Sequence, residues 1–359
     1  MNTENSNTII KIFCLGCLML GCKTEGTVEQ SDYTEYSVQN NQVFLSAEDT
    51  PFFGNPKSIK AVSDGLFFTD VGYYQITKVD KEGNLLFSFG KEGRGPGEFQ
   101  SISGFWSFEN ENLVYDYNSF KFLTFDHNGK LINEEVLEEN PLNPDSKLSI
   151  PITLDAISSE TLLIPTGGFQ GSLFAIVDRI SGDITYTGSA VLELVEFNNQ
   201  DDMKTQARGE IPDSHRNMVL LSSSSSAIYS FQQTTGVLEK YTHEGEQVWS
   251  KEMVIPAQRN LFDQIAEHNR EVGYKSFLYA KAMDAQKGGV AVLLNVPEDQ
   301  PLTIVWVPED GSKIDVVKVE GIMLDSAGFI EGFTISPDGQ HAYYLKRSKG
   351  IIYQFEWPL

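Results

Sequence analysis

The chain has 359 residues, of which 50 are acidic and 27 are basic, and its formal net charge at pH 7 is −23. A surface this acidic repels phosphate backbones and anionic lipid headgroups, which argues against nucleic acid as a partner and against flat binding to a membrane. The length suffices for two average domains or for one large all-β domain.

The first patterned segment is the short apolar run 12–21, which follows Lys11. A run of about ten residues is too short to cross about 30 Å of hydrocarbon as a helix, so we interpret residues 1–21 as a signal peptide. The run ends in Leu-Met-Leu-Gly before Cys22, which resembles a bacterial lipobox and predicts that Cys22 carries acyl chains. A plain signal peptide with incidental cysteines is the alternative interpretation.

The placement of the cysteines supports a lipid anchor. All three, Cys14, Cys17 and Cys22, lie in this first segment, so no cysteine follows Cys22 with which it could form a disulfide. At about 0.8 kcal/mol per buried CH₂, two or three acyl chains hold a protein firmly on a membrane. Because Lys23 replaces the Asp associated with inner-membrane retention, we expect an outer-membrane lipoprotein, facing either the periplasm or the medium. The polar residues that follow predict a flexible tether over 22–41.

From residue 42 onward, short runs rich in Val, Ile, Phe, Tyr and Thr alternate with turns of Gly, Asp, Asn and Ser, which predicts an all-β fold. One pattern recurs: a β-run, an acidic or polar turn with Gly, and a second β-run. The copies begin at residues 78, 124, 176, 240, 305 and 345. Their spacing suits four-stranded blades of about 40–50 residues, so we predict a six-bladed β-propeller over 42–359.

The copies extend into blades in chain order. Blade one is expected at 58–89, blade two at 104–136, blade three at 149–187, blade four at 216–254, blade five at 277–319 and blade six at 331–356. Blade six has only three strands before the chain ends. Because an unpaired edge promotes aggregation, we predict that Gln42–Ala47 supplies the fourth strand and closes the ring.

The lengths of the connections differ between the two faces of the predicted ring. The turns within blades are short, whereas the connections between blades are long: 90–102, 137–148, 188–215, 255–276 and 320–330. An Asn cap and apolar spacing predict a short helix over 260–271. Because all these connections emerge on one face, we expect that face to bind.

Residues 90–99, Gly-Lys-Glu-Gly-Arg-Gly-Pro-Gly-Glu-Phe, form a crossover between blades, since Gly and Pro specify its shape. With the lipobox and the tether, this segment resembles the six-bladed β-propeller lipoproteins of Bacteroidetes, which are related to NHL-repeat and TolB-like propellers. The Asp residues that end 68–70 and 114–116, and Ser-Pro-Asp-Gly at 336–339, fit the same pattern. The resemblance implies an envelope-exposed ring that binds a small molecule, a glycan or a protein partner.

Two pairs of charged residues near this crossover are candidate ligand contacts. Arg94 and Glu98 lie within it and are expected either to project toward the channel and pair with a ligand or to form an internal salt bridge. Asp70 and Asp116 end two strands on the same face. Their carboxylates are expected either to bind sugar hydroxyls or a cation, or to begin Asx turns.

Tyr73 and Tyr117 follow those strands, and they either stack on sugar rings or pack between blades. In the insert between blades three and four, Arg208, His215 and Arg216 form the best candidate for holding an anionic substrate, with a solvated loop as the alternative.

No motif in the sequence indicates a catalytic residue, a metal ligand or a cofactor. The histidines form no His-Glu-x-x-His set, and the chain has no Gly-x-Ser-x-Gly elbow. We therefore expect a lipid-anchored propeller that binds a ligand at its loop-rich face. The alternatives are a hydrolase or lyase acting on carbohydrates or lactones at the channel mouth, and a structural subunit of an envelope complex.

Overall fold

The computed structural model describes residues 33–136, 154–194, 199–273, 275–297, 299–324 and 332–359. The expected signal peptide, Cys22 and the connection 137–148 lie outside these residues, as does most of the connection 320–330. Six separate sheets hold the strands of the described chain, which confirms the prediction of a six-bladed β-propeller.

Blades 1 to 4 are four-stranded antiparallel sheets whose strands follow chain order. Blade 1 contains β3 (Pro56–Val62), β4 (Gly65–Asp70), β5 (Gln75–Val79) and β6 (Leu85–Phe89). Blade 2 contains β7 (Gly104–Ser107), β8 (Asn112–Asp116), β9 (Lys121–Phe125) and β10 (Leu131–Val136). Blade 3 contains β11 (Asp155–Ala156), β12 (Thr161–Pro165), β13 (Phe174–Asp178) and β14 (Ile184–Thr187). Blade 4 contains β15 (Val219–Ser223), β16 (Ile228–Gln232), β17 (Val237–Tyr241) and β18 (Gln247–Glu252).

Blades 5 and 6 each also receive one strand from the N-terminal part of the chain. Blade 5 contains β19 (Ala280–Gln286), β20 (Gly289–Leu294), β21 (Pro301–Pro308) and β22 (Ile314–Met323). Blade 6 contains β23 (Gly332–Ile335), β24 (His341–Lys346) and β25 (Ile351–Glu356). Short 3-10 turns span Phe169–Gly171, Asp213–His215, Pro256–Gln258 and Arg347–Lys349.

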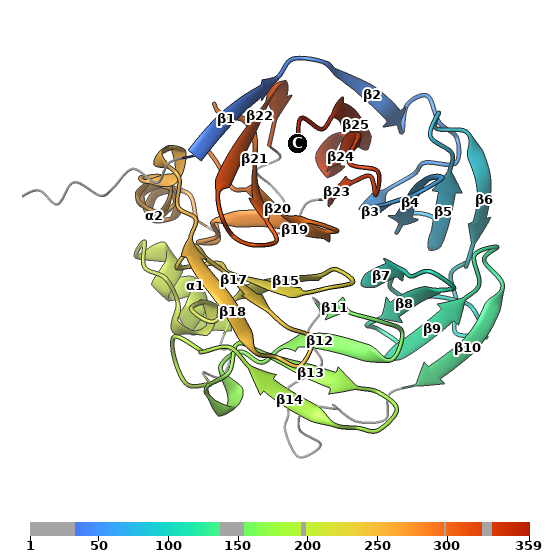
Figure 1. Ribbon diagram of the computed structural model, residues 1–359, viewed down its shortest axis with the longest axis horizontal. Coiled ribbons are helices and arrows are strands. Elements are labelled where there is room, and N and C mark those ends of the chain that lie inside the picture. The colour runs from blue at the N-terminus through green and yellow to red at the C-terminus, as the bar shows by residue number, and fades with distance from the viewer. Residues whose placement is uncertain (1–32, 137–153, 195–198, 274, 298, 325–331) are drawn as a thin grey trace, which may run out of the picture. The chain divides into compact units, whose positions relative to one another are not determined.

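The blades surround a centre, and the first strand of each is the innermost: β3, β7, β11, β15, β19 and β23 (Figure 1). We call the strands of a blade A to D from the inside outward. The ring closes through β2 (Asn41–Ser46), which pairs antiparallel with β25 as strand D of blade 6. Gln42 lies opposite Gln354, and its amide donates to the Gln354 side chain at 2.8 Å. The predicted closure by 42–47 is therefore confirmed.

A further strand, β1 (Tyr33–Val38), runs parallel to β22 and adds a fifth strand to blade 5. The flexible tether predicted over 22–41 is therefore wrong from residue 33 onward. The polar residues that suggested a tether alternate with residues that pack inward: Glu35 faces solvent and pairs with Lys318 at 2.9 Å, whereas Val38 is buried. Alternation of this kind suits a strand on the outside of a sheet.

The hydrophobic core lies in the seams between neighbouring blades. In the seam between blades 1 and 2, for example, Phe67 and Ile76 pack against Val114 and Leu123. Both faces of the middle strands are covered, so β4, β8, β16 and β20 are buried along their whole length. Radial packing of this kind explains why these strands have no solvent-exposed face.

The two faces of the ring carry different connections. One face, which we call the turn face, holds the A–B and C–D turns; in the part of the chain that the structure describes, none is longer than the five-residue turns such as 336–340. The other, which we call the insert face, holds the B–C loops and the D–A connections, including 90–103, 188–218 and 253–279. The contrast predicted between the two sets of loops is therefore present in the described residues.

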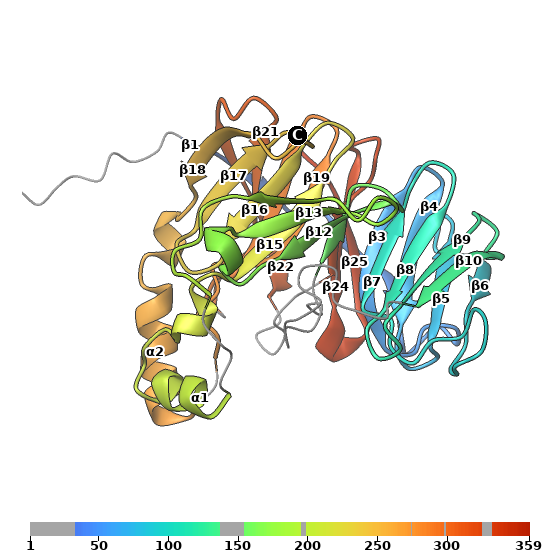
Figure 2. The same ribbon diagram turned by 90° about the horizontal axis from the view of Figure 1, so that it is seen from below.

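The longest described connections carry the two α-helices. The helix predicted over 260–271 is confirmed as α2 (Leu261–Glu271), although the Asn260 side chain makes no capping hydrogen bond. The sequence did not indicate α1 (Asn199–Ala207), which is polar nearly all round. Figure 2 shows both helices projecting from the same side of the ring. No helix in the described part of the chain is both long and apolar enough to span a bilayer.

Candidate functional site

The Gly-rich crossover has a fixed shape. Gly90 adopts φ +85°, and a Cβ there would lie 2.1 Å from the ring of Phe99, which is fully buried. The backbone doubles back on itself, with the Phe99 amide donating to Lys91 O at 2.8 Å and the Gly93 amide donating to Phe99 O at 3.0 Å. These contacts make 90–99 a rigid crossover between blades 1 and 2.

Glu98 belongs to the inside of this crossover. Its carboxylate accepts a hydrogen bond from the Gly95 amide at 2.7 Å and pairs with Lys91 at 2.9 Å. The Lys91 side chain, followed by the Gly95 amide, holds the pKa of Glu98 below its usual range. The internal salt bridge weighed for Glu98 is therefore present, and its partner is Lys91 rather than Arg94.

Among the predicted site residues, Arg94 lines a pocket. Its exposed side chain lines a half-open pocket of about 350 Å³ on the insert face. The other lining residues are Glu92, Gly93, Gln100 and Asn118. One cation, one carboxylate and two amides give this pocket both donors and acceptors of hydrogen bonds.

The structure gives Asp70 and Asp116 a different role from the predicted ligand contact. Asp70 is fully buried, and its carboxylate accepts hydrogen bonds from four backbone amides, those of Gly54, Asn55, Gly72 and Tyr73, at 2.6–3.1 Å. Asp116 is equally buried and accepts from the amides of Gln100, Asn118 and Ser119 at 2.6–3.2 Å. Carboxylates held in this way have no surface left for a sugar or a cation, so the Asx-turn alternative holds for both. Each fastens a B–C loop to the connection that precedes its blade.

The two tyrosines differ in exposure. Tyr73 is 49% exposed on the insert face, so its ring is available for contact. Tyr117 is partly buried and packs against the rings of Tyr115 and Phe120, which supports the packing alternative.

The structure does not present Arg208, His215 and Arg216 as a free cationic group. Arg208 pairs with Glu210 at 3.1 Å, and Arg216 pairs with Asp213 at 3.0 Å. His215 is partly buried, its Nδ1 lies 3.3 Å from the Gln206 amide nitrogen, and burial lowers its pKa. Each arginine therefore has a carboxylate partner within its own segment, and anion binding by these three residues stays a prediction.

Two of the inserts, those before and after blade 4, pack against each other. Ile211, from the connection between blades 3 and 4, packs onto Leu261 and Ile265 of α2. A Cβ on Gly209 would lie 2.9 Å from the Ala266 carbonyl oxygen, so the end of the α1 segment lies against α2. Around blade 4, the insert face therefore consists of two segments whose helices pack together, and this packing holds them more rigidly than two separate loops would be held.

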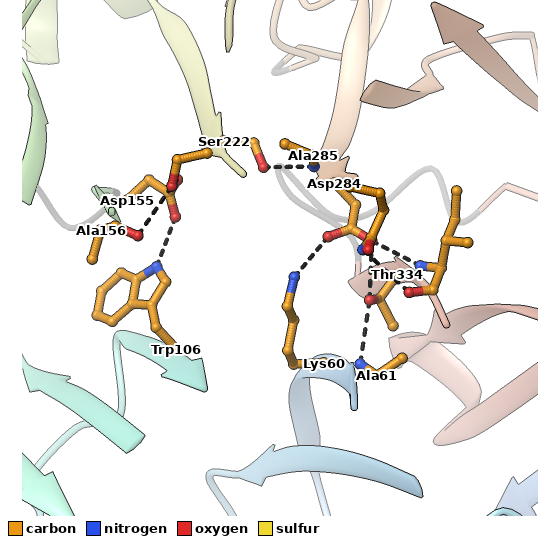
Figure 3. A network of polar contacts seen from close by, with 12 residues as sticks. Lys60, Ala61, Trp106, Asp155, Ala156, Ser222, Asp284, Ala285 and Thr334 are labelled. Atoms are coloured by element: carbon orange, nitrogen blue, oxygen red, sulfur yellow. Dashed lines mark hydrogen bonds and ion pairs between the residues drawn. The ribbon is translucent and has the colours of Figure 1, made fainter. Parts of the chain in front are cut away.

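Sequence reasoning missed a ring of polar contacts inside the channel. It uses an equivalent position in the innermost strand of every blade, with one or two residues between that position and the A–B turn. The six residues are Lys60, Trp106, Asp155, Ser222, Asp284 and Thr334 (Figure 3). The ring therefore lies toward the turn face, at the far end of the channel from the insert face.

These side chains link neighbouring blades. The amide of Ala61 donates to Thr334 Oγ1 at 3.2 Å, and the Thr334 hydroxyl donates to Asp284 at 3.1 Å. On the other side of blade 5, the amide of Ala285 donates to Ser222 Oγ at 2.9 Å. An innermost strand has one row of backbone groups without a strand partner, and these side chains satisfy part of that row.

A second group of contacts in the ring involves Asp155. It accepts from Trp106 Nε1 at 2.7 Å and from the Ser223 hydroxyl at 2.9 Å, which links blades 2, 3 and 4. Burial raises the pKa of Asp155 in spite of these two donors.

The one ion pair of the ring joins Lys60 to Asp284 at 2.9 Å. Burial opposes the charge on Lys60, but Asp284 outweighs it and raises the pKa of the lysine. The Lys60 side chain is 33% exposed and the Asp284 side chain 5%, so the lysine is the part of the pair that solvent in the channel reaches.

The signal that could have revealed this ring is weak. In the sequence, Lys60 stands out only as a charged residue between Ile59 and Ala61 in a predicted strand. That its ion-pair partner Asp284 lies nearby becomes visible only in the folded ring, where blades 1 and 5 both face the channel. Within the described residues, no three His, Cys, Asp or Glu side chains are grouped so that they could hold a metal ion.

Comparisons with known proteins agree with this architecture. Residues 21–143 match the family model DUF5128, described as a 6-bladed beta-propeller. A solved structure of a Bacteroides vulgatus protein of the DUF4221 family is similar to this chain at 10% identity and a TM-score of 0.56, over 89% of this chain and 96% of that one. A Bacteroides fragilis protein assigned as exported is similar at 12% identity and a TM-score of 0.53, over 90% and 99%. A search of curated proteins found no match. The six sheets and the family model together show that this chain is a six-bladed β-propeller.

Proposed function

We propose that this chain is a lipid-anchored propeller of the bacterial envelope that binds a ligand at its insert face. The ligand is a glycan, a small molecule or a protein partner. The six blades provide a rigid scaffold, and the B–C loops and D–A connections provide the contacts.

The observation that carries this proposal is the asymmetry between the faces. Over the described residues the turn face has only short turns, such as 63–64 and 287–288, whereas the insert face holds 90–103, 188–218 and 253–279. Ordering extra chain costs conformational entropy of about 1–2 kcal/mol per residue. Long connections that lie on one face of a scaffold, two of them packed together, are typical of a binding surface.

The insert face also has the chemistry for binding. The pocket beside Arg94 offers donors from the guanidinium and amides and an acceptor from Glu92. Tyr73 is exposed on the same face, and an exposed aromatic ring stacks well on a sugar. A few convergent polar groups fix the orientation of a small ligand in its site, and the pocket beside Arg94 supplies groups of this kind.

The test combines a ligand screen with two matched variants. The purified protein is screened on a glycan array and by thermal shift against small molecules, and envelope proteins are tested for co-purification. Ligands that bind are then measured with Arg94→Ala on the insert face and with Lys130→Ala in the C–D turn 126–130 of the turn face. Both variants remove one exposed cation.

We expect Arg94→Ala to weaken binding by about tenfold, which corresponds to about 1.4 kcal/mol, and Lys130→Ala to leave it unchanged. Binding that depends on Lys130 and not on Arg94 would place the ligand on the turn face and overturn the proposal.

The anchor is supported by the apolar run 12–21 and by Cys22, after which the chain contains no cysteine. Cells fed an alkyne-bearing fatty acid should label the native protein and not the Cys22→Ser variant. The Cys17→Ser variant is the matched control and should label normally. Labelling that survives in Cys22→Ser would contradict the proposed anchor site.

A further inference from the structure

Two cations without carboxylate partners in the described chain lie at the insert-face ends of neighbouring segments of blades 6 and 1. A Cβ on Gly332 would lie 2.9 Å from Leu345 Cβ and 3.3 Å from Ile59 Cγ1, so β24 and β3 meet at this point. Arg347 follows Leu345 by two residues, and Lys57 precedes Ile59 by two. Because β24 runs toward the insert face and β3 runs away from it, both cations lie at the insert-face end of the seam.

The hydrogen bonding of both side chains is incomplete. Lys57 is partly buried, and among the described residues its ammonium donates only to the Ile102 carbonyl oxygen, at 3.0 Å. Arg347 Nε is buried without a hydrogen-bond partner, and its guanidinium makes no ion pair within the described chain. Burial lowers the pKa of Lys57, and the positive charge of Arg347 lowers it further. Because β24 and β3 meet near Gly332, the two positive charges act on one another across this seam.

Three other partly buried cations of this protein are compensated by carboxylates, whereas Lys346, next to Arg347, donates within the described residues only to the Met323 carbonyl oxygen at 3.0 Å. Lys78 pairs with Asp64 at 2.7 Å, and Lys121 pairs with Glu134 at 3.1 Å. Arg179 pairs with Glu135. Burying a cation without a counter-charge is costly. The chain has almost twice as many acidic as basic residues, so carboxylates are abundant as potential partners. Two neighbouring cations that lack such partners indicate a place prepared for an external anion.

We propose that Lys57 and Arg347 bind an oxyanion of the ligand, namely a carboxylate, sulfate or phosphate group. This inference rests on the proposed function, because it takes the insert face as the binding face, and it adds that the ligand is acidic. A guanidinium presents two parallel N–H donors that match two oxygens of such a group, and a lysine adds a compact charge. The negative protein surface then favours ligands whose anionic group is single and localised, since a polyanion is repelled elsewhere.

The direct test is thermal denaturation of the full-length protein with simple oxyanions. Sodium sulfate, sodium phosphate and sodium glucuronate are compared with sodium chloride at equal ionic strength, and glucose is the neutral counterpart of glucuronate. At about one hundred times its dissociation constant, a bound oxyanion should raise the midpoint by about 3 °C. The oxyanion with the largest effect shows whether an acidic sugar, a sulfate ester or a phosphate is the natural group.

Three variants locate the effect. Lys57→Met and Arg347→Gln should each weaken oxyanion binding by about tenfold or more. Lys349→Met removes an exposed lysine from the same Arg347–Lys349 turn and should change nothing. In buffer without oxyanion, Arg347→Gln should raise the midpoint, because it removes the repulsion of Lys57; an arginine with a purely structural role would lower it.

The inference is overturned if no oxyanion stabilises the protein beyond chloride, or if Lys349→Met weakens binding as much as Arg347→Gln. The two proposals fail separately. A neutral ligand whose binding requires Arg94, together with no response to oxyanions, would leave the insert face as the binding face and remove the acidic specificity. Oxyanion binding that requires Arg347, together with ligands from the screen that require Lys130, would keep the anion site and overturn the proposed function.

Discussion

Closure of the ring by β2 can be tested by the change Leu45→Ala. Leu45 is 5% exposed and packs in the cluster that contains Ile59, Leu345 and Ile352, where blades 6 and 1 meet. The substitution removes three buried carbons, which at about 0.8 kcal/mol each corresponds to about 2.4 kcal/mol of lost transfer free energy. The cavity left behind adds to this, so we expect a loss of about 3 kcal/mol in the free energy of unfolding.

Val43→Ala is the matched control, because Val43 lies on the same strand and is 54% exposed. Its cost should stay below about 1 kcal/mol. Urea denaturation followed by tryptophan fluorescence measures both, with the slope unchanged if only stability differs. Equal costs for the two variants would refute the reasoning, because they would mean that Leu45 is not packed between the first and last blades.

Three further predictions follow from buried or close-packed groups. Because the pKa of Asp155 is raised, the folded protein holds the carboxyl proton of Asp155 more tightly than the unfolded chain does, so this group makes the stability of the wild-type protein fall as pH rises above about 4. The Asp155→Asn variant should show a smaller decline in stability when denaturation curves are taken between pH 4 and 8. An equal decline in the variant and the wild-type protein would contradict this prediction. Asp70→Ala leaves four backbone amides without their acceptor and should cost about 3 kcal/mol or more in urea denaturation, whereas a loss under about 1 kcal/mol would show that these amides find other partners. Gly90→Ala should lower the thermal midpoint much more than Gly182→Ala, since both glycines have positive φ but only at Gly90 would the new Cβ meet a buried ring; similar midpoints would refute the close approach of Phe99.

The architecture could be predicted from the sequence because its signals are local and repeated. Five of the six predicted copies span the C–D turns of blades 1 to 5, so their spacing indicates the blade repeat. The sixth copy, at 345–352, spans the loop between strands B and C of blade 6, because strand D of that blade comes from β2. The missing fourth strand of the last blade then calls for a partner, and the run at 42–47 was the available one. Strand β1 escaped prediction because it pairs in parallel with β22, about 280 residues away, and its pattern is mostly polar.

The site was harder to predict, because its contacts are not local. Asp70 and Asp116 were correctly placed at strand ends, but only the folded chain shows that they accept backbone amides rather than a ligand. Lys60 and Asp284 lie 224 residues apart and meet only across blade 6. For Arg347 the informative fact is the lack of a partner for its buried Nε, and a sequence cannot show that.

The most direct test of the binding face is photocrosslinking, which captures whatever ligand the envelope supplies. A benzophenone amino acid is placed at Asn118, which lines the insert-face pocket, or at Asn128, an exposed residue in a C–D turn of the turn face. Each protein is irradiated in the bacterial envelope, and adducts are identified by mass spectrometry. Our account predicts a defined adduct from Asn118 and none from Asn128; an adduct formed only from Asn128 would contradict it.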